Sequence, residues 1–341
     1  MRAPLRSLLL LISILTLFGC KSETSYEVIT GYAQGGTYNI RCNVPPEVSK
    51  SELSSLIDRE LVAIDNSISG YNKGSVLSKV NAGENVPLDK YFVEVFNKSL
   101  DIWKLSGGAF DPSAGPLFSL WGYGFDKTSV DTTMIPSLKE HIGMDLFEIY
   151  EDSQGLFRLR KLDSQAQLNF NAIAQGYTCD VIGELLDELG CEDYLIEIGG
   201  EILCKGKSSR GDDWRIWIDK PVDGNDRAGA LKQDILSISD CAVVTSGNYR
   251  KFYYENGVKY SHTINPLTGF PVRHSLLSAT VVADNCADAD AYATWFMVVG
   301  VEDAKRLAEA LEVGVYLVYG EQENMSVWHT EGLKLDEEIK E

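Results

Sequence analysis

The sequence predicts an α+β fold in one elaborate domain, with mixed or antiparallel sheets and packed helices. Segments typical of strands outnumber those typical of helices, and short Gly-containing turns join many of them. Strands and helices do not alternate strictly, as they would around a doubly wound parallel sheet. The chain of 341 residues shows no internal repeat and no linker long enough to divide it.

The spacing of apolar residues predicts each element. Helices are predicted at 49–64, 89–105, 172–189, 287–299 and 302–311, where apolar residues recur at helical spacing. Strands are predicted at 28–42 around a Gly35-Gly36 turn, and at 194–198, 201–204, 214–218, 236–244, 252–254, 277–282, 313–319 and 325–329. Ser49 and Glu52 match a capping box at the start of the first helix. Segment 115–125, rich in Gly and aromatic residues, is expected to be loop.

Composition restricts the class of partner. The formal net charge is −19, and no Lys/Arg-rich run interrupts it, which argues against a nucleic-acid partner. Apart from Cys20, the cysteines show no C-x-x-C spacing, so a zinc site is not expected. We expect Cys42, Cys179, Cys191, Cys204, Cys241 and Cys286 to be mostly free, buried thiols.

The N-terminus is typical of a targeting segment. Arg2 and Arg6 precede an apolar stretch at 8–18 that is too short to span a bilayer comfortably. It ends in Leu-Phe-Gly-Cys20, which resembles the lipobox of bacterial lipoproteins; the alternative is an ordinary signal peptide with a chance cysteine. The expected organisation is a signal peptide at 1–19, a lipidated Cys20 with its tether at 20–27, and one domain at 28–335. The mature protein would be an exported lipoprotein, anchored to a membrane and facing the periplasm.

Segment 286–295 carries the strongest local signal for chemistry. Asp290 and Thr294 lie four apart and share one face of a predicted helix. Carboxylate and hydroxyl oxygens suit a hard cation, and the alanines between them would permit a close approach. Asp288 is a second candidate carboxylate. The alternative is an acidic first turn that only stabilises the helix.

The other candidate segments are weak when taken singly. Residues 169–176 precede and begin a predicted helix, where backbone groups suit an anion or a cation, although a simple N-cap is the plainer reading. His262 lies in a turn-rich segment, and a lone histidine is more often structural than catalytic.

Taken in order, the motifs resemble the ApbE family, the FAD:protein FMN transferases. The resemblance rests on SGGAFDP (106–112), GPL (115–117), LWG (120–122), NAIAQGY (171–177), IGGE (198–201), TSGNY (245–249), HTINPLTG (262–269) and DADAYAT (288–294). It extends from about residue 34 to about residue 320, and it implies the ApbE-type fold.

The resemblance implies an activity and a site. The family transfers FMN from FAD to a Thr or Ser hydroxyl of a target protein, forming a phosphoester and releasing AMP with the help of Mg²⁺. The implied acceptor is a membrane-associated electron-transfer subunit. By resemblance, His262 is the general base, and the metal ligands are the Ala172 carbonyl, Asp290 and Thr294. The implied FAD contacts are Gln34, Tyr71, Ala109, Phe110, Asp111, Asn169, Gln175 and Ile264.

The chain departs from the family at several positions. Asn169 and Gln175 stand where many members carry Asp and Lys, so one positive and one negative charge are both absent. Arg210, Arg250 and Arg273 are possible substitutes for the cation. Two other functions stay open: an FAD pyrophosphatase that yields FMN and AMP, and a lipoprotein that binds FAD without turnover.

Overall fold

The computed structural model describes residues 26–123, 130–225, 229–249, 252–255 and 258–336. The expected signal peptide and Cys20 lie outside the described residues. The first strand begins at Tyr26, so two residues of the expected tether belong to the folded domain. No helix in the described ranges is long and apolar enough to cross a membrane.

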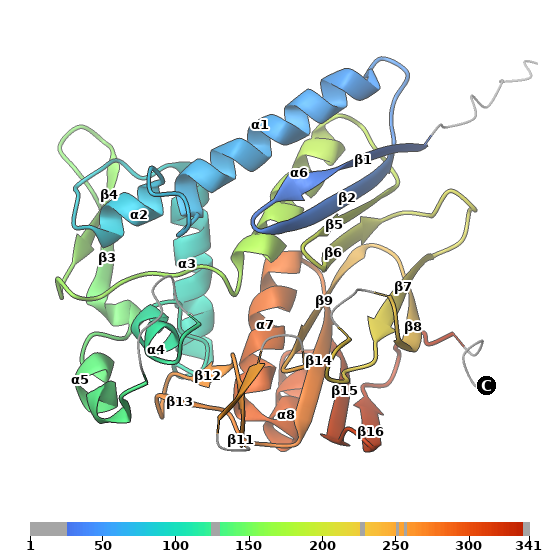
Figure 1. Cartoon of the computed structure of the whole chain (residues 1–341). Helices are drawn as coiled ribbons and strands as arrows, with labels where there is room; N and C mark the ends of the chain where they lie inside the picture. Colours follow the sequence, from blue (N-terminus) through green and yellow to red (C-terminus); the bar gives the residue numbers. More distant parts are fainter. Residues whose placement is uncertain (1–25, 124–129, 226–228, 250–251, 256–257, 337–341) are drawn as a thin grey trace, which may run out of the picture.

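An eight-stranded antiparallel sheet forms the centre of the molecule (Figure 1), in the order β1-β2-β5-β6-β9-β14-β15-β16. Its strands are β1 (Tyr26–Ala33), β2 (Gly36–Asn43), β5 (Tyr194–Ile198), β6 (Glu201–Lys205), β9 (Cys241–Gly247), β14 (Leu276–Ala283), β15 (Gly314–Glu321) and β16 (Asn324–His329). Four small hairpins accompany it: β3 (Phe147–Glu151) with β4 (Phe157–Lys161), β7 (Trp214–Asp219) with β8 (Lys232–Ile238), β10 (Phe252–Glu255) with β11 (Val258–Ser261), and β12 (Ile264–Asn265) with β13 (Phe270–Pro271).

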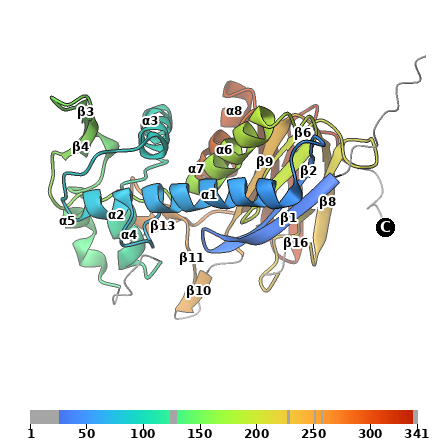
Figure 2. The same ribbon diagram turned by 90° about the horizontal axis from the view of Figure 1, so that it is seen from above.

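Helices cover one face of this sheet and extend beyond its edge. They are α1 (Lys50–Ile68), α2 (Val76–Asn81), α3 (Lys90–Leu105), α4 (Gly115–Leu120), α5 (Ile135–Lys139), α6 (Ala174–Glu188), α7 (Cys286–Val299) and α8 (Val301–Ala310), with short 3₁₀ turns at Thr132–Met134 and Met144–Leu146. Helix α6 packs on β5 and β6, α7 on β9 and β14, and α8 on β15. Figure 2 shows α1 running from the sheet to a lateral group that contains α2, α4 and α5.

Two apolar layers hold these parts together. The larger core lies between the sheet and its helices, and includes the fully buried Ile40, Phe92 and Phe296. A second cluster lies where the β7–β8 hairpin covers the opposite face, around Trp214, Leu236 and Tyr316. The α+β expectation is confirmed.

Most predicted elements are present, and two local predictions are wrong. Segment 115–125 contains α4, whose Leu117 and Leu120 are buried. Segment 236–244 is not one strand: β8 ends at Ile238 and β9 begins at Cys241, with Asp240 between them at φ 55°. No element was predicted at α2, α5, the β3–β4 hairpin, β11 or the β12–β13 hairpin, all of which are short.

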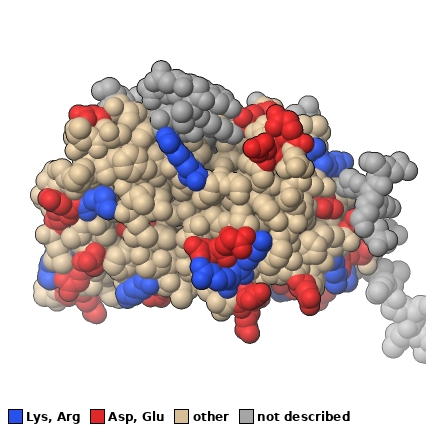
Figure 3. All heavy atoms as spheres, turned by 90° about the horizontal axis from the view of Figure 1, so that it is seen from below, with Lys and Arg blue, Asp and Glu red and all other residues tan. Residues whose placement is uncertain are grey.

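The cysteine prediction agrees with the structure. All six cysteines of the described ranges are free, and five of them are buried. Charge is distributed without a basic cluster on the face seen from below, where Lys and Arg lie scattered among Asp and Glu (Figure 3).

Candidate functional site

The site is centred where helices α6 and α7 cross. Gly176 lies in the first turn of α6, and its N–H donates to Asp290 Oδ2 of α7 at 3.1 Å. The first amides of a helix have no partner within it, so a carboxylate placed there satisfies one of them. Asp290 is 5% exposed, and burial raises its pKa from 3.8 to about 7. The buried carboxylate therefore lies at the positive end of a helix.

The absence of a side chain at Gly176 permits this crossing. A Cβ at this position would lie 2.3 Å from the Cys286 carbonyl oxygen and 2.8 Å from Asp290 Cβ. The alanines of α7 are completely buried in the same packing. The sequence predicts that these alanines permit the close approach of a ligand. In the structure they instead permit close packing of α7 against the chain's own helix and sheet.

We predict that Gly176→Ala destabilises the fold by about 1–3 kcal/mol, because the added methyl group overpacks a helix contact. Urea unfolding followed by circular dichroism measures this effect. Gly115→Ala is the control, because its nearest neighbour is Asn169 Cβ at 3.8 Å. Equal unfolding midpoints for the two variants would contradict this account of the crossing.

Thr294 and Ala172 complete the expected metal-ligand set. Thr294 lies one turn after Asp290, and its Oγ1 is 3.5 Å from Ser246 Oγ on β9. Ala172 lies two residues before the first residue of α6, which begins at Ala174 rather than at Ala172. No group of three or more His, Cys, Asp or Glu in the described chain could hold a metal ion. The expected set has one carboxylate only, and its other donors are a hydroxyl and a backbone carbonyl.

Segment 169–176 joins several expected parts of the site. The backbone N–H of Asn169 donates to the Pro112 carbonyl of the GAFDP turn at 2.7 Å. Asn171 Nδ2 donates to the Tyr71 hydroxyl at 3.2 Å. Tyr71 is 71% exposed, so its ring does not belong to the core.

The same segment contacts two glycine turns of the sheet through Gln175. A Cβ on Gly199, in the β5–β6 turn, would lie 2.0 Å from Gln175 Nε2, and one on Gly36 would lie 3.9 Å from that atom. Gln34 stands beside these turns at φ 50°, and its Nε2 donates to Thr178 Oγ1 at 2.5 Å. Its other amide atom, Oε1, is buried without a hydrogen-bond partner among the described residues. An unsatisfied buried oxygen is costly, so this atom is available to a ligand's donor.

The turn at 109–111 is held rigidly. Asp111 Oδ1 accepts from the Ser113 N–H at 2.8 Å, and Oδ2 accepts from Trp103 Nε1 at 3.0 Å. Burial raises the pKa of this carboxyl. Ala109, Phe110 and Ile264 are no more than 3% exposed as whole residues, so their expected contacts with FAD stay a prediction.

His262 lies close in sequence to a short strand that contacts α7. It comes two residues before β12, which contacts α7, and its ring packs edge-on against Tyr123 with centroids 6.2 Å apart. The other three histidines lie elsewhere: His141 contacts Asp163, His274 the Met297 carbonyl, and His329 the Tyr316 ring. The role of His262 as general base stays a prediction.

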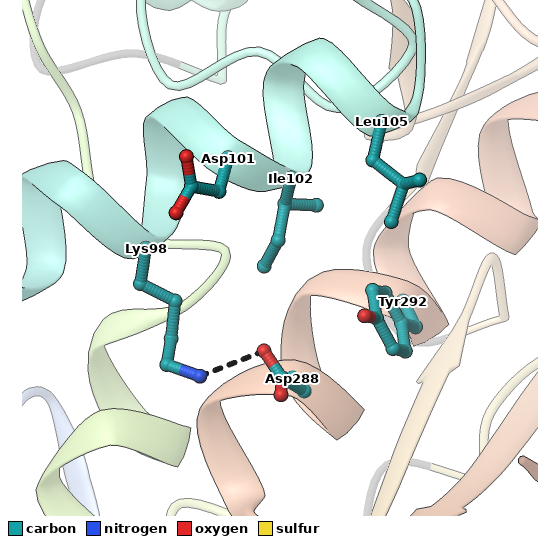
Figure 4. Close-up of a pocket in the computed structure, with 6 residues that line it drawn as sticks. All are labelled: Lys98, Asp101, Ile102, Leu105, Asp288 and Tyr292. Atoms are coloured by element: carbon teal, nitrogen blue, oxygen red, sulfur yellow. Dashed lines mark hydrogen bonds and ion pairs between the residues drawn. The ribbon is translucent and has the colours of Figure 1, made fainter.

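Asp288 has a structural role. Its N–H is capped by Asn285 Oδ1 at 2.9 Å, and its carboxylate pairs with Lys98 of α3 at 2.8 Å. Figure 4 shows this pair in a hollow of about 360 Å³ between α3 and α7, lined also by Asp101, Ile102, Leu105 and Tyr292. Asp288 and Asp290 are two residues apart on a helix, so they project from different faces. The hollow is thus distinct from the contact between Asp290 and Gly176.

Sequence reasoning missed Asp180 and gave no role to Ser246. Asp180 lies one turn after Gly176 on α6, and it accepts from the N–H groups of Cys286 and Ala287 at 2.7 and 2.9 Å. In the sequence, the one sign that Asp180 lies near the site is its position four residues after Gly176, on the same face of the helix. Of the possible replacement cations, Arg210 pairs with Asp212 at 3.2 Å, and Arg250 lies outside the described residues.

Fold and site together define an α+β protein with candidate cation and anion sites at the crossing of two helices. The model of the ApbE family matches residues 32–317. The chain belongs to the ApbE family.

Individual relatives match along nearly their whole length. The FAD:protein FMN transferase of Vibrio cholerae serotype O1 is 33% identical over 324 residues, covering 91% of this chain and 92% of that protein. The protein of the same name from Escherichia coli K12 is 29% identical and covers 94% and 93%. The crystal structure of the Pseudomonas stutzeri flavinyl transferase ApbE, apo form, aligns with a TM-score of 0.79 at 30% identity, covering 90% of this chain and 95% of that one.

Proposed function

We propose that this chain is an FAD:protein FMN transferase that acts on a Thr or Ser hydroxyl of a target protein and uses Mg²⁺. Its membership of the ApbE family and the activity for which its relatives are named support the reaction. One observation supports the location of the site: segment 169–176 contacts the Tyr71 hydroxyl, the Gly199 turn and the Asp290 carboxylate. These groups surround the start of α6, where an anion such as a diphosphate is favoured.

The residues present fit a bound magnesium ion. Asp290 is a buried carboxylate whose pKa is raised by desolvation, and a cation at its free oxygen would relieve that cost. Thr294 Oγ1 and the Ala172 carbonyl would be the other protein ligands, with water or phosphate completing the shell. When bound, the ion would neutralise charge that develops on the diphosphate.

The chain's own groups then position and deprotonate the acceptor. His262 takes the proton of the acceptor hydroxyl. The hydroxyl oxygen forms a bond to the phosphorus of the FMN half, the P–O bond to the AMP half breaks, and AMP leaves with the bridging oxygen. Exposed Tyr71 offers a face on which a flat ring can stack.

The mature domain incubated with FAD, Mg²⁺ and a Thr-bearing acceptor domain tests this proposal. Mass spectrometry should find the acceptor heavier by one FMN less one water, with one AMP released for each. AMP release at a rate that the acceptor leaves unchanged would identify a pyrophosphatase instead. Tight FAD binding without any turnover would identify a binding protein. The acceptor's nature as a membrane-associated electron-transfer subunit is part of the proposal, and a panel of such subunits tests it in the same assay.

Magnesium should stabilise the fold more at about pH 8 than at about pH 6. The folded-state pKa of Asp290 is about 7, above its ordinary 3.8. Its contribution to stability in the metal-free protein is therefore full below about pH 4 and is lost as the pH rises through about 7. At the lower pH a proton competes with the cation for this carboxylate. Thermal unfolding with and without MgCl₂ measures the difference, and a larger shift at the lower pH would contradict the site.

We also propose that the chain is an exported lipoprotein, lipidated on Cys20 and held at a membrane. The lipobox-like end of the N-terminal apolar segment supports this location. Mass spectrometry of the mature N-terminal peptide should find a diacylated Cys20. An N-terminus that carries no lipid and begins elsewhere would exclude the anchor.

A further inference from the structure

Helices α6 and α7 hold each other through two reciprocal contacts. The amide of Gly176 on α6 donates to Asp290 of α7 at 3.1 Å. The amides of Cys286 and Ala287 on α7 donate to the two carboxylate oxygens of Asp180 on α6, at 2.7 and 2.9 Å. Each helix thus presents unsatisfied N-terminal amides to a carboxylate of the other.

The spacing makes these contacts mechanically dependent on each other. Gly176 and Asp180 are one turn apart on α6, and Cys286 and Asp290 are one turn apart on α7. A shift of the start of α7 along α6 would therefore move Asp290 away from Gly176. Asp180 accepts from the amides of Cys286 and Ala287, and Asn285 accepts from the next amide, that of Asp288. Each of the first three amides of α7 therefore has a side-chain acceptor.

The carboxylate of Asp180 is not available to bind the proposed magnesium ion. Its two oxygens are occupied by backbone amides, and burial raises its pKa to about 6. Its charge acts directly on Asp290 and contributes to the raised pKa of that carboxyl, whereas its hydrogen bonds act on the site through the position of α7.

We propose that Asp180 is a positioning residue that sets the place of α7 so that Asp290 faces the start of α6. The consequence for magnesium rests on the proposed function; the consequence for the contact between Gly176 and Asp290 does not. A merely structural cap would change stability but would leave that contact and the metal affinity as they are.

Asp180→Asn tests the proposal, because it keeps the size of the side chain but replaces one acceptor with a donor that faces an amide. Hydrogen exchange of the Gly176 amide in metal-free protein should become at least about 10-fold faster, because its acceptor is displaced. The Mg²⁺ concentration that gives half the maximal thermal shift, measured without FAD, should rise about 10–100-fold, as when residues that orient metal ligands are changed. Asp180→Glu keeps the negative charge but lengthens the side chain, so displacement of α7 alone should change both readouts in the same direction. This variant also replaces Asp180→Asn if that variant does not fold.

Asp219→Asn is the matched control. Asp219 is a buried carboxylate that also accepts a backbone amide, that of Gly229 at 2.8 Å, but it lies in the β7–β8 hairpin. It should lower the unfolding temperature and leave both readouts unchanged. If the Asp180 variants do no more than this control, Asp180 is only a structural cap and the proposal is overturned. If the wild-type protein transfers no FMN while Gly176 exchange still rises in Asp180→Asn, the positioning role stands and the proposed function falls.

Discussion

Asp290→Ala is expected to remove the magnesium dependence of FMN transfer and to lower turnover by about 10³-fold, since a catalytic metal ion supplies several kcal/mol of charge stabilisation in the transition state. Asp290 is the buried carboxylate of the candidate site. Among the described residues, it accepts a hydrogen bond from the Gly176 amide. Steady-state transfer rates at a series of Mg²⁺ concentrations measure the effect.

The loss of activity should not come from unfolding. At about pH 8 the substitution removes an unfavourable buried charge but also the acceptor of the Gly176 amide, so the two effects oppose each other and the metal-free variant should stay folded, as thermal unfolding measures. Asp288→Ala is the control, because Asp288 pairs with Lys98 on another face of α7. An unchanged magnesium titration in Asp290→Ala, together with a changed one in Asp288→Ala, would move the metal site to Asp288.

His262→Ala is expected to bind FAD with little change and to transfer FMN about 10²–10⁴-fold more slowly, as on loss of a general base. Single-turnover kinetics and an FAD binding titration separate the chemical step from binding.

His329→Ala provides the comparison for this variant. His329 is exposed on β16, where its ring stacks on Tyr316, so its loss should not change the rate. Transfer by His262→Ala at the wild-type rate would remove the assignment of His262 as the base.

The sequence predicted the elements whose boundaries depend on local interactions. Ser49 and Asp89 accept amides three residues ahead, and α1 and α3 begin immediately after them. Helix α4 was missed because it is a short element held by burial of Leu117 and Leu120 among distant residues. The break in 236–244 depends on one positive φ angle at Asp240, which an alternating pattern does not reveal.

The candidate site divides in the same way. The common face of Asp290 and Thr294 follows from their spacing on one helix, so it was predictable. The contacts of Asp180 join residues 106 and 107 positions apart, so no local pattern could reveal them. The burial of Ala109, Phe110 and Ile264 also depends on packing between distant segments, which no local pattern reveals.

The convergence at the start of α6 has a consequence for how the protein matures. The grouped residues run from Gln34 in the first hairpin to Thr294 in α7, and the sheet between them joins Asn43 to Asp193, 150 residues later. Pairings over such separations form slowly, after the chain is largely complete. No nascent fragment that ends before α7 contains Asp290. Binding of FAD at the proposed site would therefore require that α7 has been synthesised and packed against α6.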